Sequence, residues 1–147
     1  MQLFNITLVP SACEDSSKLE GIPYVDESMK NRKRILIVDD DLDLHLFLGD
    51  RLTAMGFDVL TAANGQEGLD LLQNQSVDGI LLDIDMPVMG GLTMLEKLGN
   101  FNAPVIVMSA NSHRPELEQA ILKGAMDFLI KPISPDDLTS KCFRLFQ

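Results

Sequence analysis

The sequence predicts an α/β fold in which a doubly wound, five-stranded parallel sheet carries one helix after each strand. Short apolar runs recur along the chain, and stretches with apolar residues three or four positions apart separate them. The runs are typical of strands buried on both faces, and the wider spacing is typical of helices with one buried face. Strands and helices in alternation favour parallel strands joined by right-handed crossovers.

The first two strand–helix pairs open the predicted domain. Residues 35–38 (Ile-Leu-Ile-Val) form an uninterrupted apolar run, which predicts the first strand. Apolar side chains then recur at helical spacing over residues 44–55, and Gly56 ends that helix, as glycine commonly does. The second strand is expected at residues 57–62 and the second helix at residues 66–73.

The other three pairs follow the same alternation. Their strands are expected at residues 80–82, 104–108 and 128–130, and their helices at residues 92–98, 115–123 and 135–146. Ser134 is expected to cap the last helix, with Pro135 at its first position. The expected strand order is 2-1-3-4-5, the flavodoxin-like arrangement, whose ligands bind at the carboxyl ends of the strands.

Size and composition limit the function classes. The 147 residues, 46% hydrophobic and 23% charged, are typical of one globular domain. No apolar run approaches the roughly 20 residues that cross a bilayer, and residues 1–10 lack the basic start of a signal peptide. Cys13 and Cys142 lack the spacing of metal ligands, which favours a reducing, cytoplasmic setting.

Residues 1–33 are weakly periodic and contain several helix breakers, so we expect a flexible N-terminal extension before a domain over residues 34–147. The extension has five acidic and four basic residues, so its net charge is −1. Because the whole chain has a net charge of −10, the domain carries −9. A body this acidic repels phosphate backbones, which argues against direct binding of nucleic acid.

Polar residues stand where four of the predicted strands end. Asp39 and Asp40 follow the first strand, Asp83 follows the third, Ser109 ends the fourth and Lys131 follows the fifth. In the expected order these strands are neighbours, so their ends converge on one crevice. Close carboxylates raise one another's pKa, and a hard divalent cation such as Mg²⁺ relieves that repulsion. A carboxylate, a metal ion and a lysine directed at one point are the parts of a site that forms an aspartyl phosphate.

Four motifs carry these residues: Ile37-Val-Asp-Asp-Asp, Leu82-Asp-Ile-Asp-Met-Pro-Val-Met-Gly-Gly, Val107-Met-Ser-Ala and Ile130-Lys-Pro-Ile. With the motifs in this order and at these spacings, the chain resembles the receiver domain of response regulators, the chemotaxis-regulator-like phosphoproteins of two-component signal transduction. The resemblance runs from Arg34 to about Phe146. It implies a signalling domain of a phosphorelay rather than an enzyme, with self-phosphotransfer and autodephosphorylation as its only reactions.

The resemblance also implies a role for each site residue. Asp83 matches the phosphoacceptor, and Asp39, Asp40 and Asp83 match the residues that bind Mg²⁺ together with a backbone carbonyl, here that of Asp85. The turn that follows departs from the family, because Gly90 stands where an aspartate is frequent.

Three further residues match the switch of the family. Ser109 corresponds to the switch hydroxyl, Lys131 to the lysine that binds the phosphoryl group, and Phe128 to an aromatic side chain that turns inward on phosphorylation. Phe128 lacks the hydroxyl of the more common tyrosine. The Lys131–Pro132 peptide bond is expected to be cis, as it usually is in this family.

The implied partners are proteins. A sensor histidine kinase or a histidine phosphotransfer protein donates the phosphoryl group, and the new charge alters the face formed by helix 115–123, strand 128–130 and helix 135–146. That face then controls a separate target, a second copy of the chain through homodimerisation, or an output domain beyond Gln147.

Two alternatives use the same residues. Asp83-Ile84-Asp85 resembles the Asp-x-Asp motif of haloacid-dehalogenase-type phosphatases, but those enzymes place their acidic metal ligands last, and only 62 of the 147 residues follow Asp85. A phosphate-independent adaptor would usually lack an acidic ligand, the acceptor or the lysine, and this chain has them all. His45 and His113 have no ligand partners in the sequence and are expected to be exposed.

Overall fold

The computed structural model describes residues 31–110 and 114–147. The chain divides into two units between Arg32 and Lys33, and the expectation of a flexible extension falls almost wholly on residues outside the described part. The second unit contains a five-stranded sheet in the order β2-β1-β3-β4-β5, with every strand pair parallel. The strands are β1 (Arg34–Val38), β2 (Asp58–Ala62), β3 (Gly79–Asp83), β4 (Val105–Ser109) and β5 (Asp127–Ile130). The predicted fold class is therefore confirmed.

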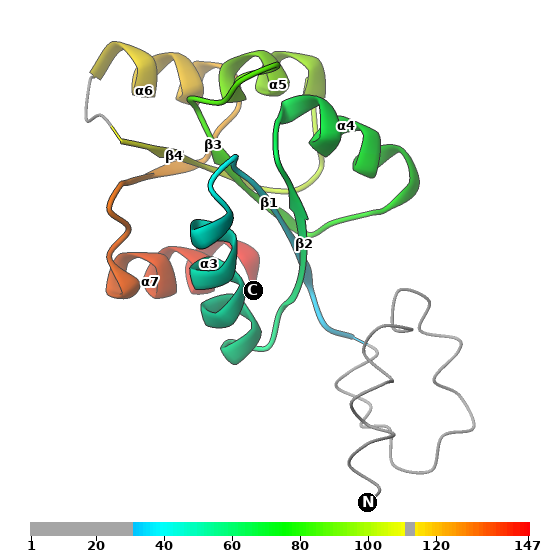
Figure 1. The fold of residues 1–147 in the computed structure, drawn as a ribbon, viewed down its shortest axis with the longest axis vertical. Helices are drawn as coiled ribbons and strands as arrows, with labels where there is room; N and C mark the ends of the chain where they lie inside the picture. Colours follow the sequence, from blue (N-terminus) through cyan, green and yellow to red (C-terminus); the bar gives the residue numbers. More distant parts are fainter. Residues whose placement is uncertain (1–30, 111–113) are drawn as a thin grey trace, which may run out of the picture. The chain divides into compact units, whose positions relative to one another are not determined.

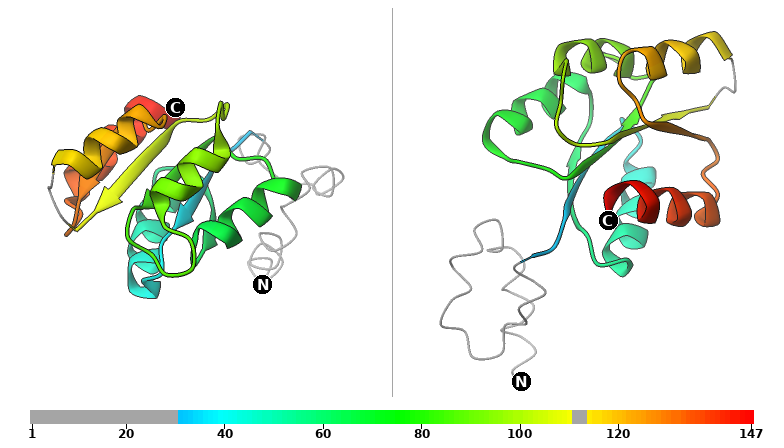
Figure 2. Two further views of the ribbon diagram at one scale, coloured as in Figure 1. Left: turned by 90° about the horizontal axis from the view of Figure 1, so that it is seen from above. Right: turned by 180° about the vertical axis from the view of Figure 1, so that it is seen from behind.

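Helices cover both faces of this sheet (Figure 1). They are α3 (Leu42–Ala54), α4 (Gly65–Asn74), α5 (Gly91–Leu98), α6 (Arg114–Leu122) and α7 (Pro135–Phe146). Helices α3 and α7 lie on one face, and α4, α5 and α6 lie on the other, as the view from behind also shows (Figure 2). Among the described residues, no helix has the length and apolar content needed to cross a membrane.

Two capping residues fix where helices begin. The Asp41 side chain accepts hydrogen bonds from the N–H groups of Asp43 and Leu44, so α3 begins at Leu42, two residues before the sequence pattern indicated. The Ser134 hydroxyl accepts from the N–H of Asp137 at 3.4 Å, with Pro135 in the first turn of α7. These contacts satisfy backbone donors that have no partner within the helix.

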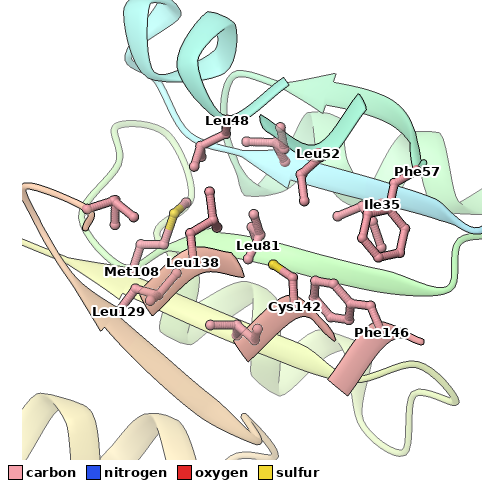
Figure 3. Packing of buried hydrophobic residues seen from close by; sticks show 13 residues of the cluster. Ile35, Leu48, Leu52, Phe57, Leu81, Met108, Leu129, Leu138, Cys142 and Phe146 are labelled. Carbon is pink, nitrogen blue, oxygen red and sulfur yellow. The ribbon is translucent and has the colours of Figure 1, made fainter. Parts of the chain in front are cut away.

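Apolar side chains fill the layer between the sheet and helices α3 and α7 (Figure 3). Leu52, Cys142 and Phe146 are among its buried members, and burying a large apolar side chain contributes roughly 1.5–3 kcal/mol. Burial also raises the pKa of the Cys142 thiol to about 12. The Phe146 ring meets Phe57 edge-on, with ring centres 6.3 Å apart. It also lies only 2.4 Å from where a Cβ on Gly79 would stand, so β3 begins at a residue without a side chain.

Strand register aligns the carboxyl ends of the central strands. Val38 of β1 pairs with Leu82 of β3, so the next residues, Asp39 and Asp83, lie at the same edge of the sheet. Ser109 of β4 pairs with Ile130 of β5 in the same way. The residues that follow these strands are therefore brought together by the backbone alone.

Candidate functional site

The buried polar residues of the described chain all lie at one edge of the sheet. Asp39 and Ser109 are fully buried and Asp83 is 3% exposed, and the remaining buried side chains are hydrophobic or cysteine. Burial of a carboxylate is unfavourable unless it is paired or hydrogen-bonded. Three buried polar groups at one edge of the sheet therefore indicate a functional site rather than a packing requirement.

Three carboxylates form an acidic cluster at this edge. Asp39, Asp40 and Asp83 each offer a carboxylate oxygen, and these oxygens lie within 4.8 Å of one another. Asp40 is exposed while the other two are buried, so the cluster opens to solvent on one side. A few carboxylates beside an opening that admits water fit the coordination that Mg²⁺ prefers.

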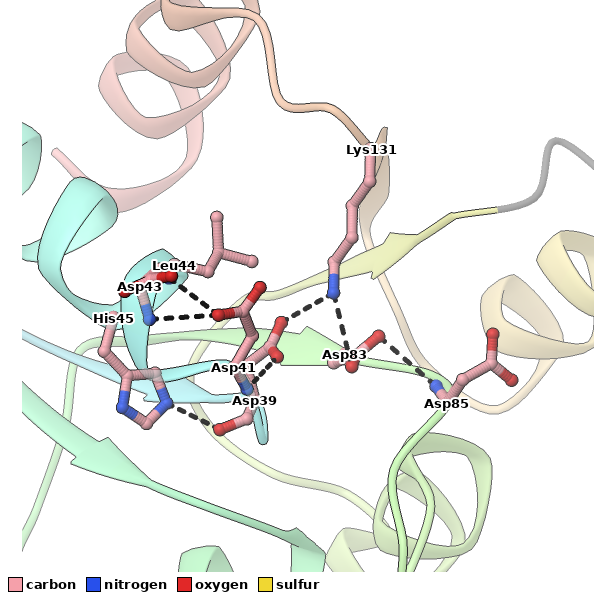
Figure 4. Close-up of polar contacts among 8 residues, drawn as sticks. All are labelled: Asp39, Asp41, Asp43, Leu44, His45, Asp83, Asp85 and Lys131. Carbon is pink, nitrogen blue, oxygen red and sulfur yellow. Dashed lines mark hydrogen bonds and ion pairs between the residues drawn. The ribbon is translucent and has the colours of Figure 1, made fainter.

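Lys131 partly neutralises the cluster. Its ammonium group lies 2.8 Å from Asp39 Oδ2 and 3.3 Å from Asp83 Oδ2 (Figure 4). Burial alone would lower the pKa of Lys131, but the contacts with Asp39 and Asp83 outweigh it and hold the pKa above its usual value. The backbone N–H of Lys131 donates to the Ser109 carbonyl at 2.7 Å, and the Lys131–Pro132 peptide bond is cis.

The carboxyl group of Asp83 has a raised pKa. Burial raises its pKa to about 6, and the charge of Asp39 adds to this. Lys131 lowers the pKa of Asp83, and so does the backbone N–H of Asp85, which donates to Asp83 Oδ1 at 3.3 Å. The two contacts together do not cancel the rise. The side chain of Asp85 is exposed, and its expected role as a carbonyl ligand stays a prediction.

The turn after β1 holds the acidic pair. The Asp39 N–H donates to the Ala62 carbonyl at 3.0 Å, and the Asp39 carboxylate accepts from the Asp41 N–H at 2.8 Å. Nε2 of His45 lies 2.6 Å from the Asp39 carbonyl oxygen. The expectation that His45 is exposed was wrong, because the helix begins early enough to turn this half-buried ring back onto the site. His113 lies outside the described residues.

The loop after β3 has an unusual backbone. Val88 has φ of 68°, and the Met89 N–H donates to the Pro87 carbonyl at 2.8 Å, which closes a γ-turn around a β-branched residue. Glycine is required at position 91, the first residue of α5, since a Cβ there would lie 2.3 Å from the Asp83 carbonyl oxygen. The sequence pattern gave no sign of the strained Val88, because β-branched residues rarely adopt a positive φ.

The arrangement matches a known family over most of its length. The family model for the response regulator receiver domain matches residues 35–143. The chain belongs to the response regulator receiver family. Among its relatives, chemotaxis protein CheY of Treponema pallidum is 36% identical over 121 residues, which is 79% of this chain and 78% of that protein. The probable transcriptional regulator ycf27 of Cyanophora paradoxa is 32% identical over 112 residues, covering 76% of this chain and 47% of the regulator.

Solved receiver structures agree with the fold. The Francisella response regulator 1452 receiver domain has a TM-score of 0.73 at 31% identity, covering 78% of this chain and 97% of that one. Response regulator TrrA of Thermotoga maritima, solved with Mg²⁺ and BeF, has a TM-score of 0.69 at 32% identity. The match covers 77% of this chain and 98% of the TrrA chain. The chain spans about half the length of the ycf27 regulator that it matches. The haloacid-dehalogenase alternative finds no support among these matches.

A second charged cluster of the receiver lies beside Phe128. Lys141 donates to the Phe128 carbonyl, lies 3.2 Å from Asp127 Oδ1 and stands over the Phe128 ring at 4.8 Å from its centre. Arg144 pairs with the other oxygen of Asp127. Burial would raise the pKa of Asp127, but hydrogen bonds from the Phe128 N–H, Lys141 and Arg144 lower it overall. Lys141 is half-buried in this cluster.

Proposed function

We propose that Asp83 accepts a phosphoryl group from the phosphohistidine of a sensor histidine kinase or a histidine phosphotransfer protein. The observation that carries the proposal is the acidic cluster of Asp39, Asp40 and Asp83 within 4.8 Å, with Lys131 bridging two of its members. Family membership supports a signalling role, and a relative solved with Mg²⁺ and BeF supports the choice of metal and of a phosphoryl-like ligand.

The transfer step uses an oxygen of Asp83. That oxygen attacks phosphorus, the P–N bond of the phosphohistidine breaks, and the imidazole leaves with the bonding electron pair. Because its pKa is about 6, Asp83 is mostly ionised at neutral pH and available as the nucleophile. Asp39, Asp40, Asp83 and the backbone carbonyl of Asp85 would hold Mg²⁺. When bound, the ion would supply positive charge beside the phosphoryl group that is being transferred.

The switch begins once the phosphoryl group is in place. The Ser109 hydroxyl and the Lys131 ammonium group bind its oxygens, and the movement of Ser109 makes room for the ring of Phe128. Burying that half-exposed ring contributes up to roughly 1.5–3 kcal/mol, which is enough to shift a two-state equilibrium substantially. The change then reaches α6, β5 and α7.

The readout lies on the face formed by α6, β5 and α7. Leu122 and Met126 are 86% and 58% exposed there, so apolar surface is available for a partner. We propose that this face binds a target, a second copy of the chain or an output domain of the kind found in longer regulators. The proposal places the protein in the cytoplasm, where kinases have access to ATP.

The phosphoacceptor is tested by labelling. Incubation with acetyl phosphate and Mg²⁺ should add one phosphoryl group to the parent, seen by intact-mass spectrometry and removed by hydroxylamine. Asp83→Asn should abolish the label, and Asp127→Asn, a matched change at a carboxylate outside the site, should retain it. Equal labelling of parent and Asp83→Asn would refute the assignment.

The switch is tested on the parent and on Ser109→Ala, with beryllofluoride in place of the phosphoryl group. Hydrogen exchange of α6 and β5 should change on addition of beryllofluoride and Mg²⁺ to the parent. Ser109→Ala should bind the mimic at Asp83 and yet show a much smaller change on that face. A full response in Ser109→Ala would mean that the hydroxyl does not couple the site to the surface.

A further inference from the structure

The peptide group between Asp39 and Asp40 joins two of the three carboxylates in the acidic cluster. Its carbonyl oxygen lies 2.6 Å from Nε2 of His45 (Figure 4). A carbonyl oxygen can only accept a hydrogen bond, so the proton resides on Nε2 and the imidazole donates. This holds for the neutral ring in that tautomer and for the imidazolium alike.

The helix fixes the donor. The backbone N–H of His45 donates to the Asp41 carbonyl at 3.1 Å, and Asp41 caps α3 through its side chain. The half-buried ring therefore approaches the turn from a rigid element. The N–H and carboxylate of Asp39 already have backbone partners in Ala62 and Asp41, so the bond from His45 determines how the Asp39–Asp40 peptide plane is rotated.

We propose that His45 is a positioning residue that sets the relative direction of the Asp39 and Asp40 carboxylates and makes the cluster selective for Mg²⁺ over Ca²⁺. Mg²⁺ requires near-ideal octahedral geometry with short bonds, whereas Ca²⁺ accepts more oxygens in a flexible arrangement. A peptide plane that rotates freely therefore weakens Mg²⁺ binding more than Ca²⁺ binding. This inference rests on the proposed function, because it takes the acidic cluster as the Mg²⁺ site.

The test is a pair of titrations, with Mg²⁺ and with Ca²⁺, on the full chain at constant pH. His45→Ala removes the donor. His45→Gln restores one, because its amide nitrogen lies the same number of bonds from Cα as Nε2 of histidine. Leu46→Ala is the control, since Leu46 is the next residue of α3 and is 68% exposed.

His45→Ala should weaken Mg²⁺ binding about tenfold, the usual size of an outer-shell effect, and should change Ca²⁺ binding less than about twofold. His45→Gln should recover most of the Mg²⁺ affinity, and Leu46→Ala should match the parent for both ions. Unchanged Mg²⁺ binding in His45→Ala, or equal losses for both ions, overturns the proposal. If thermal unfolding shows that His45→Ala does not fold, His45→Phe keeps a ring without a donor and should show the same loss of selectivity.

Asp40→Ala separates this inference from the proposed function. If the parent fails to bind Mg²⁺, or if Asp40→Ala binds it as tightly, the acidic cluster is not the metal site and both proposals fail. If Asp40→Ala weakens Mg²⁺ binding while His45→Ala does not, the metal site stands and only the role of His45 is overturned.

Discussion

Asp83 at the end of β3 and Asp127 at the start of β5 are both partly or wholly removed from solvent, yet their pKa values shift in opposite directions. Burial and the neighbouring Asp39 raise the pKa of Asp83 to about 6. Burial also acts to raise the pKa of Asp127, but hydrogen bonds from the Phe128 N–H, Lys141 and Arg144 lower it. Asp83 is the more deeply buried of the two and faces a second carboxylate and one cation, Lys131, whereas Asp127 faces two cations.

This difference separates a site that can take a ligand from a contact that maintains structure. The negative charge of the cluster around Asp83 exceeds the positive charge of Lys131, so a bound cation can relieve an unfavourable arrangement. The charges around Asp127 already satisfy one another, and a ligand would gain little there. Three substitutions test the comparison.

The largest effect is expected from Asp83→Asn. Without Mg²⁺ at pH 7.5, the free energy of unfolding of this variant should be about 1–3 kcal/mol higher than that of the parent, because the substitution removes a buried charge whose pKa burial raises to about 6. Urea denaturation in EDTA measures the difference. Saturating Mg²⁺ should narrow it by stabilising the parent. A variant less stable than the parent in EDTA would show that the contact between Lys131 and Asp83 outweighs the burial.

The same pair of proteins has a defined pH dependence. Between the unfolded pKa of 3.8 and the folded value of about 6, the folded parent binds more protons at Asp83 than the unfolded chain. The contribution of Asp83 to the free energy of unfolding therefore falls as pH rises through this window. The difference between Asp83→Asn and the parent should disappear near pH 4, where the carboxyl group is protonated in the folded state.

Asp127→Asn should have the opposite sign and a smaller size. Its lowered folded pKa means that Asp127 stabilises the fold above its unfolded pKa and loses that contribution as pH falls through the folded value. The substitution should lower the free energy of unfolding by roughly 1–2 kcal/mol at pH 7.5. The ion pair with Arg144 adds little to this loss, because Arg144 is largely exposed to solvent. Mg²⁺ should leave this loss unchanged. A loss of stability that depends on Mg²⁺ would show that the clusters around Asp83 and Asp127 are coupled, which contradicts the contrast between them.

The smallest effect is expected at Val88, in the loop beside Asp83. Val88→Gly relieves a positive φ but loosens the unfolded chain, so the net gain in stability should be about 0.5 kcal/mol. Thermal unfolding in EDTA, with Leu122→Ala as an exposed control, measures it. A gain would mark a second unfavourable feature at the Asp83 end of the domain, and a clear loss would mean that the valine side chain contributes to the loop.

Much of this architecture could be predicted because it depends on local pattern and topology. The apolar runs predicted the strands, and Ser134 marked the start of α7 through short-range capping that is visible in the sequence. The convergence of Asp39, Asp83 and Lys131 followed from strand order, since parallel neighbours end at the same edge.

The rest depends on tertiary geometry that residue spacing does not encode. Whether His45 points to solvent or back to Asp39 is decided by where α3 begins and by the rotation of the preceding turn. The half-burial of Lys141 depends on how closely α7 packs against β5, and Asp127 is 14 residues away in sequence. Valine rarely adopts a positive φ, so the backbone preference of Val88 predicts a different conformation from the turn that is observed.

The packing of Phe146 against Phe57 and Gly79 has a consequence for how the protein is made. A ribosome releases the chain from its N-terminal end, so Ile35 and Phe57 emerge long before the helix that covers them. The apolar layer between the sheet and helices α3 and α7 is incomplete until synthesis reaches Phe146. The apolar layer on the opposite face of the sheet contains no residue later than Ile130. Nascent chains therefore expose one face of the sheet to chaperones and proteases for longer than the other.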